Sequence, residues 1–326
     1  SLENGNIAAW KGEKKAAQIP LINLESILDF SHKGASPALL GECVKRGIGF
    51  SFLTPNGRFL ARACGVAEGN IFLRKEQYRI SDEEEKSLAI ARAMIAGKIL
   101  NARAVLMRAL RDPPLSVDKT IFHSHIRELQ DAAVCAAEAS SLDELRGIEG
   151  NGAQSYFSLL DSLILQDKKH FYFHGRNKRP PLDRMNAILS FTYTILAHDC
   201  ASALEAAGLD PYAGFLHRDR PGRLSLALDL MEELRSVYAD RFALTLVNNR
   251  MISAKNFEIK EDGAVWLNGE GRKILLTQWQ ERKRDTITHP FLQEKMVWGL
   301  IPYVQALLLA RYIRHDLDGY PPFLWK

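Results

Sequence analysis

Four residues of this sequence have types and spacing suited to divalent-metal chemistry. Asp229 and Glu232 stand three residues apart in a segment patterned as a helix, so their carboxylates share one face. His217 comes shortly before that helix, and Glu149 lies in a glycine-rich run whose backbone a ligand can approach closely. Carboxylates with one imidazole suit Mg²⁺ or Mn²⁺ and phosphate-ester chemistry better than zinc. Taken singly, the helix could be a solvated acidic face and His217 a structural histidine.

Basic residues flank these candidate ligands in the sequence. Lysine and arginine bind phosphates through charge, and arginine also through a bidentate fork. Several basic segments around one carboxylate site predict a face for a nucleic acid backbone. The expected DNA-binding residues are Arg176, Lys178, Arg179, Arg218, Arg220 and Arg223.

The composition is that of an ordinary globular protein. Apolar residues make up 46% and charged residues 25% of the 326 residues, a length that favours two domains. The four cysteines are far apart and form no CxxC pair, which indicates free thiols in a reducing cytoplasm. No apolar run approaches the ~18–20 residues that span a bilayer, so no membrane is expected. The chain begins at Ser1 without methionine, and we expect a truncated start with an early strand missing.

The hydrophobic pattern changes along the chain from strand-like to helical. Residues up to about Arg79 read as β, with a hairpin turn at Asn56-Gly57. A capping box from Ser81 to Glu84 should start the first long helix, which Asp112-Pro-Pro114 should end. Further helices are predicted at about 121–139, 152–165, 183–206, 225–239 and 291–316. Residues 242–288 appear irregular apart from a hairpin-like run around Ala264-Val-Trp266.

These patterns predict an α+β protein. A small N-terminal β-sheet domain, residues 1–80, should be followed by a larger all-helical catalytic domain, residues 81–326.

Two other functions fit parts of the sequence. The His198-Asp199 and His315-Asp316 dipeptides are typical of metal-dependent phosphohydrolases of the His-Asp type, with His170 and His174 as further ligands. A noncatalytic DNA-binding scaffold would keep the basic face and hold no metal. Retention of the whole candidate ligand set argues against the scaffold.

Four motifs in order resemble a known family, the CRISPR-associated spacer-acquisition integrases and endonucleases, the universal first Cas protein of this antiviral defence. The segments that carry the resemblance are Arg146-Gly-Ile-Glu-Gly with Tyr156-Phe157, Arg179-Pro-Pro-Leu-Asp-Arg-Met-Asn-Ala187, Gly214-Phe-Leu-His217, and Ser225-Leu-Ala-Leu-Asp229 with Leu230-Met-Glu-Glu-Leu-Arg235. The segment Ile313-Arg-His-Asp-Leu-Asp-Gly-Tyr-Pro-Pro is similar to the type I-C branch of the family.

The resemblance implies a β-sandwich-like N-terminal domain and a helical catalytic domain. It places the metal ligands on Glu149, His217 and Glu232, with Asp229 beside them as a further catalytic residue. Many family members carry aspartate at the position of Glu232, so the choice of direct ligand between Asp229 and Glu232 stays open. If these two share one cation, like-charge repulsion predicts a raised pKa for at least one of them without metal.

The implied reaction is strand transfer, in which a protospacer 3′-hydroxyl attacks the phosphodiester backbone of the repeat. With water as the nucleophile, the same site is a metal-dependent endonuclease. The implied cofactor is Mg²⁺ or Mn²⁺. The implied partners are double-stranded DNA of protospacer and repeat, a second copy of the chain in a homodimer, and a small dimeric CRISPR-associated adaptation protein. The implied location is the prokaryotic cytoplasm.

Overall fold

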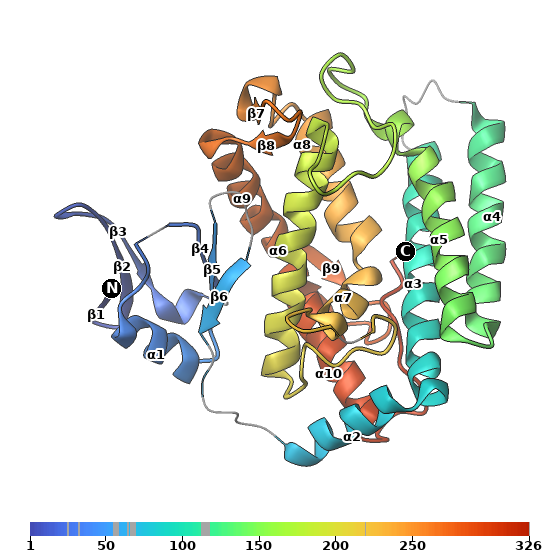
Figure 1. The fold of residues 1–326 in the computed structure, drawn as a ribbon, viewed down its shortest axis with the longest axis horizontal. Coiled ribbons are helices and arrows are strands. Elements are labelled where there is room, and N and C mark those ends of the chain that lie inside the picture. The colour runs from blue at the N-terminus through green and yellow to red at the C-terminus, as the bar shows by residue number, and fades with distance from the viewer. Residues whose placement is uncertain are drawn as a thin grey trace. The chain divides into compact units, whose positions relative to one another are not determined.

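The computed structural model describes residues 1–326 except 25, 32, 55–58, 64, 66–69, 112–117, 219 and 326. The chain divides into two compact units, residues 1–70 and 71–326 (Figure 1). A β-rich unit followed by a mostly helical one confirms the predicted fold class. The division expected at residues 80 and 81 falls inside the first helix of the second unit.

The first unit contains two three-stranded sheets. In the first sheet, all neighbouring strands are antiparallel; in the second, β4 runs parallel to β5 and β5 antiparallel to β6. Its elements are β1 (Leu2–Glu3), β2 (Asn6–Lys11), β3 (Lys14–Pro20), β4 (Ser26–Asp29), α1 (Pro37–Lys45), β5 (Gly49–Leu53) and β6 (Phe59–Ala63). Its small core consists of Leu21, Leu39, Cys43, Ile48 and Phe50, which come from the 3₁₀ turn after β3, from α1, and from β5 with the residue before it. The predicted pairing of β5 with β6 is confirmed, while its turn at Asn56-Gly57 lies outside the described residues.

The second unit is a bundle of helices with two short hairpins. Its helices are α2 (Ile71–Asp82), α3 (Glu84–Arg111), α4 (Lys119–Glu138), α5 (Leu142–Ser158), α6 (Arg184–Ala206), α7 (Ser225–Glu232), the π-helical segment η3 (Arg235–Asp240), α8 (Arg241–Asn248), α9 (Gly269–Arg284) and α10 (Ile301–Ile313). The hairpins are β7 (Phe257–Ile259) with β8 (Val265–Leu267), and β9 (Thr286–Thr288) with β10 (Lys295–Val297). Short 3₁₀ turns of this unit occupy Leu160–Leu163, Ala254–Asn256 and Trp298–Leu300, and one of the first unit occupies Leu21–Asn23.

The predicted β pattern up to Arg79 is wrong beyond Asn70, because α2 begins there. Leu73, Gln77 and Ile80 are buried at gaps of four and three, which is a helical face. The predicted capping box is also wrong. The Ser81 hydroxyl donates to the carbonyl of Tyr78 at 2.9 Å inside α2, and so does not cap α3.

The glycine-rich run Arg146–Gly152 is helical, although the sequence predicted a helix only from about residue 152. Helix α5 begins at Leu142, where the Ser141 side chain accepts a bond from the amide of Glu144. A Cβ at Gly152 would make ordinary van der Waals contact with Ile99 on α3, 3.4 Å from its Cγ1. Helix α5 packs against α3 and α4, so Glu149 stands on a helix that two neighbours hold in place.

Three further predictions differ from the structure. The helix expected at 225–239 is interrupted after Glu232 and continues as the π-helical segment η3. The region 242–288, expected to be irregular, contains α8 and α9, although its predicted hairpin-like run is confirmed as β7 and β8. The helix expected at 291–316 begins only at Ile301, because β10 occupies the preceding residues.

Helix α6 forms the centre of the helical unit. Among the described residues it is the one helix long and apolar enough to match a membrane span in composition. However, 72% of its most apolar window is buried inside the protein, as in the core helix of a globular fold.

Candidate metal and nucleic-acid site

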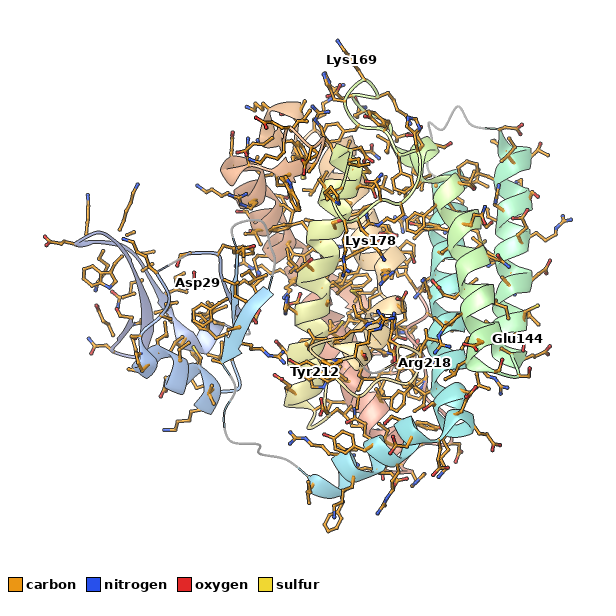
Figure 2. The ribbon with its side chains drawn as sticks, viewed as in Figure 1. Asp29, Glu144, Lys169, Lys178, Tyr212 and Arg218 are labelled. Carbon is orange, nitrogen blue, oxygen red and sulfur yellow. The ribbon has the colours of Figure 1, made fainter. Side chains whose placement is uncertain are left out.

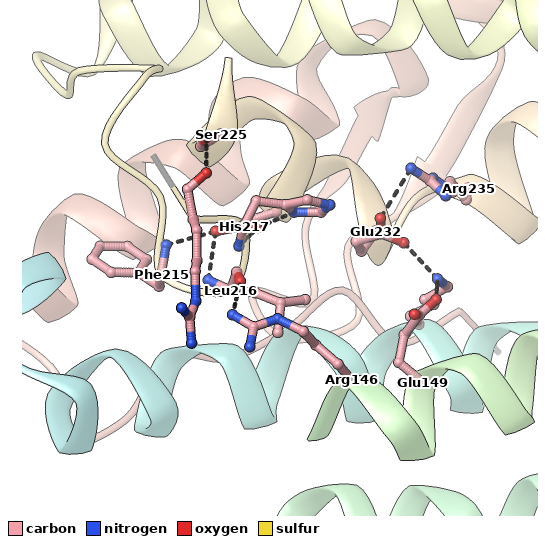
Figure 3. Close-up of polar contacts among 11 residues, drawn as sticks. Arg146, Glu149, Phe215, Leu216, His217, Ser225, Glu232 and Arg235 are labelled. Carbon is pink, nitrogen blue, oxygen red and sulfur yellow. Dashed lines mark hydrogen bonds and ion pairs between the residues drawn. The ribbon is translucent and has the colours of Figure 1, made fainter. Parts of the chain in front are cut away.

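Asp229 is fully buried and holds the loop that carries His217. Figure 3 shows Phe215, Leu216 and His217 on this loop. Its Oδ2 accepts the amides of Phe215 at 2.7 Å and Leu216 at 2.9 Å. Its Oδ1 accepts the amide of His217 at 3.1 Å and lies 2.5 Å from His217 Nδ1. Because an ionised carboxylate only accepts, Nδ1 carries the proton, and Nε2 is left as the available ring nitrogen. Asp229 therefore orients the imidazole from behind.

Gly214 begins this loop and has no room for a side chain. A Cβ there would lie 2.8 Å from Ser225 Cβ, 2.9 Å from Asp229 Oδ2 and 2.9 Å from the carbonyl oxygen of His217. Glycine at this position allows the loop to fold directly onto the start of α7.

We expect Gly214→Ala to displace the Asp229–His217 pair. Overpacking of this kind costs about 1–3 kcal/mol, so the midpoint of thermal unfolding should fall and the affinity for divalent metal should fall with it. Gly147→Ala on α5 is the matched control, because no atom lies within 4 Å of its Cβ position. That control should stabilise the protein by about 0.5–1 kcal/mol, as alanine does in helix interiors. Unchanged stability and metal affinity in Gly214→Ala would contradict the tight fit.

Glu149 and Glu232 come from different helices and are joined by one lysine (Figure 3). The Lys98 ammonium on α3 forms an ion pair with Glu149 Oε1 and lies 2.7 Å from Glu232 Oε2. On its other side, Glu232 Oε1 lies 3.0 Å from Nη2 of Arg235. The two carboxylates thus already share a cation, and it is supplied by the chain.

These cations determine the ionisation of Glu232. Burial by itself would raise the pKa of this carboxyl, but the charges of Arg235, Lys98 and His217 outweigh burial and lower the pKa to about 2. The expectation of a raised pKa from repulsion between Asp229 and Glu232 is therefore wrong for Glu232. The reason is geometric, since Asp229 turns to the backbone amides while Glu232 faces the cations.

The candidate ligands Glu149, His217 and Glu232 line one cleft of about 450 Å³, and Asp229 is not among its lining residues. The rest of the lining is Arg146, Leu216, Arg218, Arg220 and Arg223. Among the described residues, no three His, Cys, Asp or Glu side chains form a ready-made metal cage. The Lys98 ammonium holds the place between the two carboxylates that a metal ion would need. In donor type, the two carboxylates and one imidazole of the cleft nevertheless fit a hard divalent cation.

Most of the predicted DNA-binding residues are accessible to solvent, whereas one, Arg176, is bonded to other groups of the protein. Arg218 and Arg220 are exposed on the loop before α7, and Arg223 is half-buried on the same loop. Lys178 and Arg179 are exposed in the segment before α6. Figure 2 labels Lys178 and Arg218.

Arg176 differs from the other predicted DNA-binding residues because the protein occupies its donors. Its guanidinium bonds Asn186 Oδ1 at 2.7 Å and Ser190 Oγ at 3.0 Å, and lies over the ring of Tyr193. Burial lowers its pKa from the usual value. Arg176 thus braces the loop that presents Lys178 and Arg179, and its placement does not support a phosphate contact.

Behind Glu232 lies a second buried cluster. The Arg235 guanidinium stacks over the Tyr193 ring, whose hydroxyl donates to Asp240 Oδ1 at 2.5 Å. Burial raises the pKa of Asp240 to about 6, against the lowering effects of the Tyr193 bond and of Arg235. Sequence reasoning missed Arg235, although it stands three residues after Glu232 on the same face. It also missed Lys98, which no motif indicates.

Glu233, the neighbour of Glu232, engages the C-terminal segment instead of the cleft. It accepts bonds from the Tyr320 hydroxyl at 2.5 Å, Gln305 Nε2 at 3.1 Å and the amide of Phe323 at 2.7 Å. Burial raises the pKa of Glu233 to about 7, and these three bonds limit the rise. The two consecutive carboxylates at the end of α7 therefore point to different places: Glu232 faces the cleft and Glu233 contacts the C-terminal segment.

The structure does not support the His-Asp phosphohydrolase hypothesis. Asp199 accepts a bond from Trp279 Nε1 at 3.2 Å and pairs with Lys283 Nζ at 2.7 Å, both on α9. Asp316 pairs with Arg314 at 2.8 Å at the end of α10. Both aspartates thus have structural partners close by.

Comparison with known proteins gives the family. The family model described as CRISPR associated protein Cas1 matches residues 1–281. The chain belongs to the Cas1 family. It is 49% identical over 309 residues to CRISPR-associated endonuclease Cas1 1 of Chlorobaculum tepidum, covering 95% of this chain and 90% of that protein. It is also 46% identical to CRISPR-associated endonuclease Cas1 2 of Rhodospirillum rubrum, over 98% of this chain and 94% of the relative.

This member of the Cas1 family is an endonuclease and integrase of CRISPR adaptation, as the resemblance implied. Solved structures share its fold. The Thermotoga maritima Cas1 protein has a TM-score of 0.82 at 24% identity, covering 100% of this chain and 96% of that one. A casposase bound to integration product has a TM-score of 0.83 at 20% identity, covering 100% and 91%. A Cas6-RT-Cas1–Cas2 complex has a TM-score of 0.81 at 21% identity, covering 100% of this chain and 35% of that one.

Proposed function

We propose that Glu149, His217 and Glu232 hold Mg²⁺ or Mn²⁺ and that the second unit, residues 71–326, carries out phosphodiester chemistry on DNA at this cleft. The observation that carries the proposal is the convergence of two carboxylates and one oriented imidazole on a cleft lined by arginines. Because Asp229 is bonded to three backbone amides and to His217, we assign Glu232 as the direct ligand. The chemistry that a divalent cation supplies at such a site is polarisation of the scissile phosphate and activation of the attacking oxygen.

The residues of the chain supply the remaining functions. His217 presents Nε2 because Asp229 occupies Nδ1. Glu232 stays ionised at neutral pH because its pKa is about 2. Arginines of the cleft place donors where negative charge increases during phosphoryl transfer. A 3′-hydroxyl as nucleophile gives strand transfer and releases another 3′-hydroxyl, and water as nucleophile gives cleavage.

The DNA face in this proposal consists of basic residues around the cleft, which are the exposed Lys178, Arg179, Arg218 and Arg220 and the half-buried Arg223. Burial, followed by the neighbouring charges of Arg235, Arg176 and Arg179, lowers the pKa of Lys178. Crowded positive charge of this kind favours a polyanion. Phosphate contacts position a duplex without reading its sequence, so recognition of the repeat needs DNA shape or a partner protein.

For the assembly, we propose a homodimer that binds a small dimeric adaptation protein in the prokaryotic cytoplasm. The support is a shared fold with the Cas1 part of a Cas6-RT-Cas1–Cas2 complex. We also propose the type I-C branch, supported by the segment Ile313–Pro322 and its similarity to that branch.

The experiment that tests the proposal is a strand-transfer and cleavage assay on branched duplex DNA with Mg²⁺ or Mn²⁺. EDTA should abolish both activities, and excess metal should restore them, because the cleft carboxylates need a divalent cation to act on a phosphate. Full activity in the chelator would overturn the proposal and favour a metal-free mechanism. Binding of DNA without any turnover under all conditions would favour a noncatalytic scaffold.

A further inference from the structure

We propose that Lys98 is a built-in counter-ion that competes with the divalent cation for Glu149 and Glu232, so that metal and DNA bind this protein cooperatively. The inference rests on the proposed function, since it concerns the same two carboxylates. It adds a regulatory role for a lysine on α3, and it predicts that the cleft admits metal well only when a phosphate is present.

The charges around the two carboxylates carry the argument. Glu149 and Glu232 contribute two negative charges, and the side chains that touch them, Lys98 and Arg235, contribute two positive charges. The group is therefore neutral without any metal. A divalent cation added to it would leave two uncompensated positive charges.

The surroundings make that excess charge costly. The Lys98 side chain is 11% exposed and that of Glu232 only 4%, so water screens this pair weakly. At low effective dielectric, two cations that contact the same carboxylate repel each other strongly. The Lys98 ammonium must therefore leave the carboxylates, or the metal binds poorly.

A DNA phosphate removes the conflict. Each phosphodiester carries one negative charge and accepts hydrogen bonds from an ammonium group. When the DNA backbone enters the cleft, which Glu149 and Glu232 line, its phosphate offers the Lys98 ammonium between them a new acceptor, and the net charge of the group falls. By thermodynamic reciprocity, DNA then raises the affinity for metal by the factor by which metal raises the affinity for DNA.

Lys98, not Arg235, is the residue with this role. Arg235 contacts one of the two carboxylates and is fixed over the Tyr193 ring. Lys98 contacts both carboxylates, as a bridging metal ion must. A lysine side chain is a flexible stem with a compact charge, so it can move to a new partner more easily than a stacked guanidinium.

The test is calorimetric titration with Mn²⁺, with and without a short branched DNA duplex, with a gel after each run to show that the DNA is intact. In the unaltered protein, DNA should tighten Mn²⁺ binding by about tenfold or more, within the usual range of coupling between sites. In Lys98→Met, Mn²⁺ should bind at least about tenfold more tightly without DNA, and the effect of DNA should shrink towards none. Lys98→Arg keeps the charge and should keep the coupling.

Two further variants keep the test decisive. Lys86→Met removes one charge near the start of the same helix, where Lys86 pairs with Glu83. This variant should bind Mn²⁺ as the unaltered protein does, both with and without DNA. Lys98→Gln replaces the methionine variant if that one does not fold, and added Mn²⁺ should raise its unfolding temperature more than that of the unaltered protein.

The outcomes separate this inference from the proposed function. One contrary result is that Lys98→Met and Lys98→Gln bind Mn²⁺ without DNA only as tightly as the unaltered protein does. That result would overturn the role of Lys98 and leave the metal site intact. The loss of metal binding in the lysine variants would also overturn it, because it would make Lys98 a supporting residue. No Mn²⁺ binding by any variant, with or without DNA, would overturn the proposed function and this inference with it.

Discussion

Glu149→Gln should reduce metal-dependent strand transfer and cleavage by at least about 10³-fold, because loss of a ligand charge removes several kcal/mol of metal-assisted catalysis. The amide keeps the shape of the side chain, so the loss reports on charge and not on packing. Glu232→Gln should have a similar effect. Asp229→Asn should lose about 10- to 100-fold, as expected for a residue that orients a ligand from behind.

The control for these variants is Glu138→Gln, which neutralises an exposed carboxylate at the end of the neighbouring helix α4 and should retain full activity. Reaction rates in Mg²⁺ and Mn²⁺, together with metal titration by calorimetry, rank the losses of activity and of metal affinity in the three variants. A larger loss of metal affinity in Asp229→Asn than in Glu232→Gln would reverse the assignment of the direct ligand. No loss in either variant would remove α7 from the metal site.

The second large effect is expected from replacing Arg218, Arg220 and Arg223 together by alanine. Each lost phosphate contact reduces the slope of log K against log salt by about 0.9, so the triple variant should lose about 2.7 of that slope and bind duplex DNA much more weakly at low salt. The effect should be similar for different DNA sequences, because phosphate contacts do not read bases.

Lys255, Lys260 and Lys273, all exposed around the β7–β8 hairpin and α9, provide a charge-matched control. Their triple replacement by alanine removes the same total charge and should leave the salt slope unchanged. Fluorescence anisotropy at several salt concentrations measures both variants. Equal slopes for the arginine variant and the unaltered protein would place the DNA face elsewhere.

The candidate ligands could be named from the sequence because residue types and short motifs carry that information. Glu149, His217 and Glu232 stand in motifs whose order resembles a known family. Their local setting was harder to predict. The sequence predicted a helix only from about residue 152, whereas α5 begins at Leu142 and continues through the glycines around Glu149. Local propensity counts each glycine against a helix and cannot register the packing of α5 on α3 and α4.

The cation between the two carboxylates could not be predicted from the sequence. Lys98 is 51 residues from Glu149, on a helix whose pattern shows only a buried stripe. Only the packing of α3 against α5 and α7 brings its ammonium to both carboxylates. The roles of Asp229 and Arg176 were likewise decided by contacts across the fold, since both side chains are held by protein groups that spacing does not reveal.

The two adjacent glutamates at the end of α7 have a consequence for the order in which the protein matures. Glu233 receives bonds from Tyr320 and Phe323, and Asn101 on α3 also donates to the carbonyl of Phe323. The ribosome makes Tyr320 and Phe323 87 and 90 residues after Glu233, when every element that lines the cleft has already been made. Until then, Glu233 lacks two of its donors and the helix end that bears Glu232 lacks its brace. We therefore expect a nascent chain to acquire a competent nuclease centre only after Tyr320 and Phe323 have been made and have docked against Glu233.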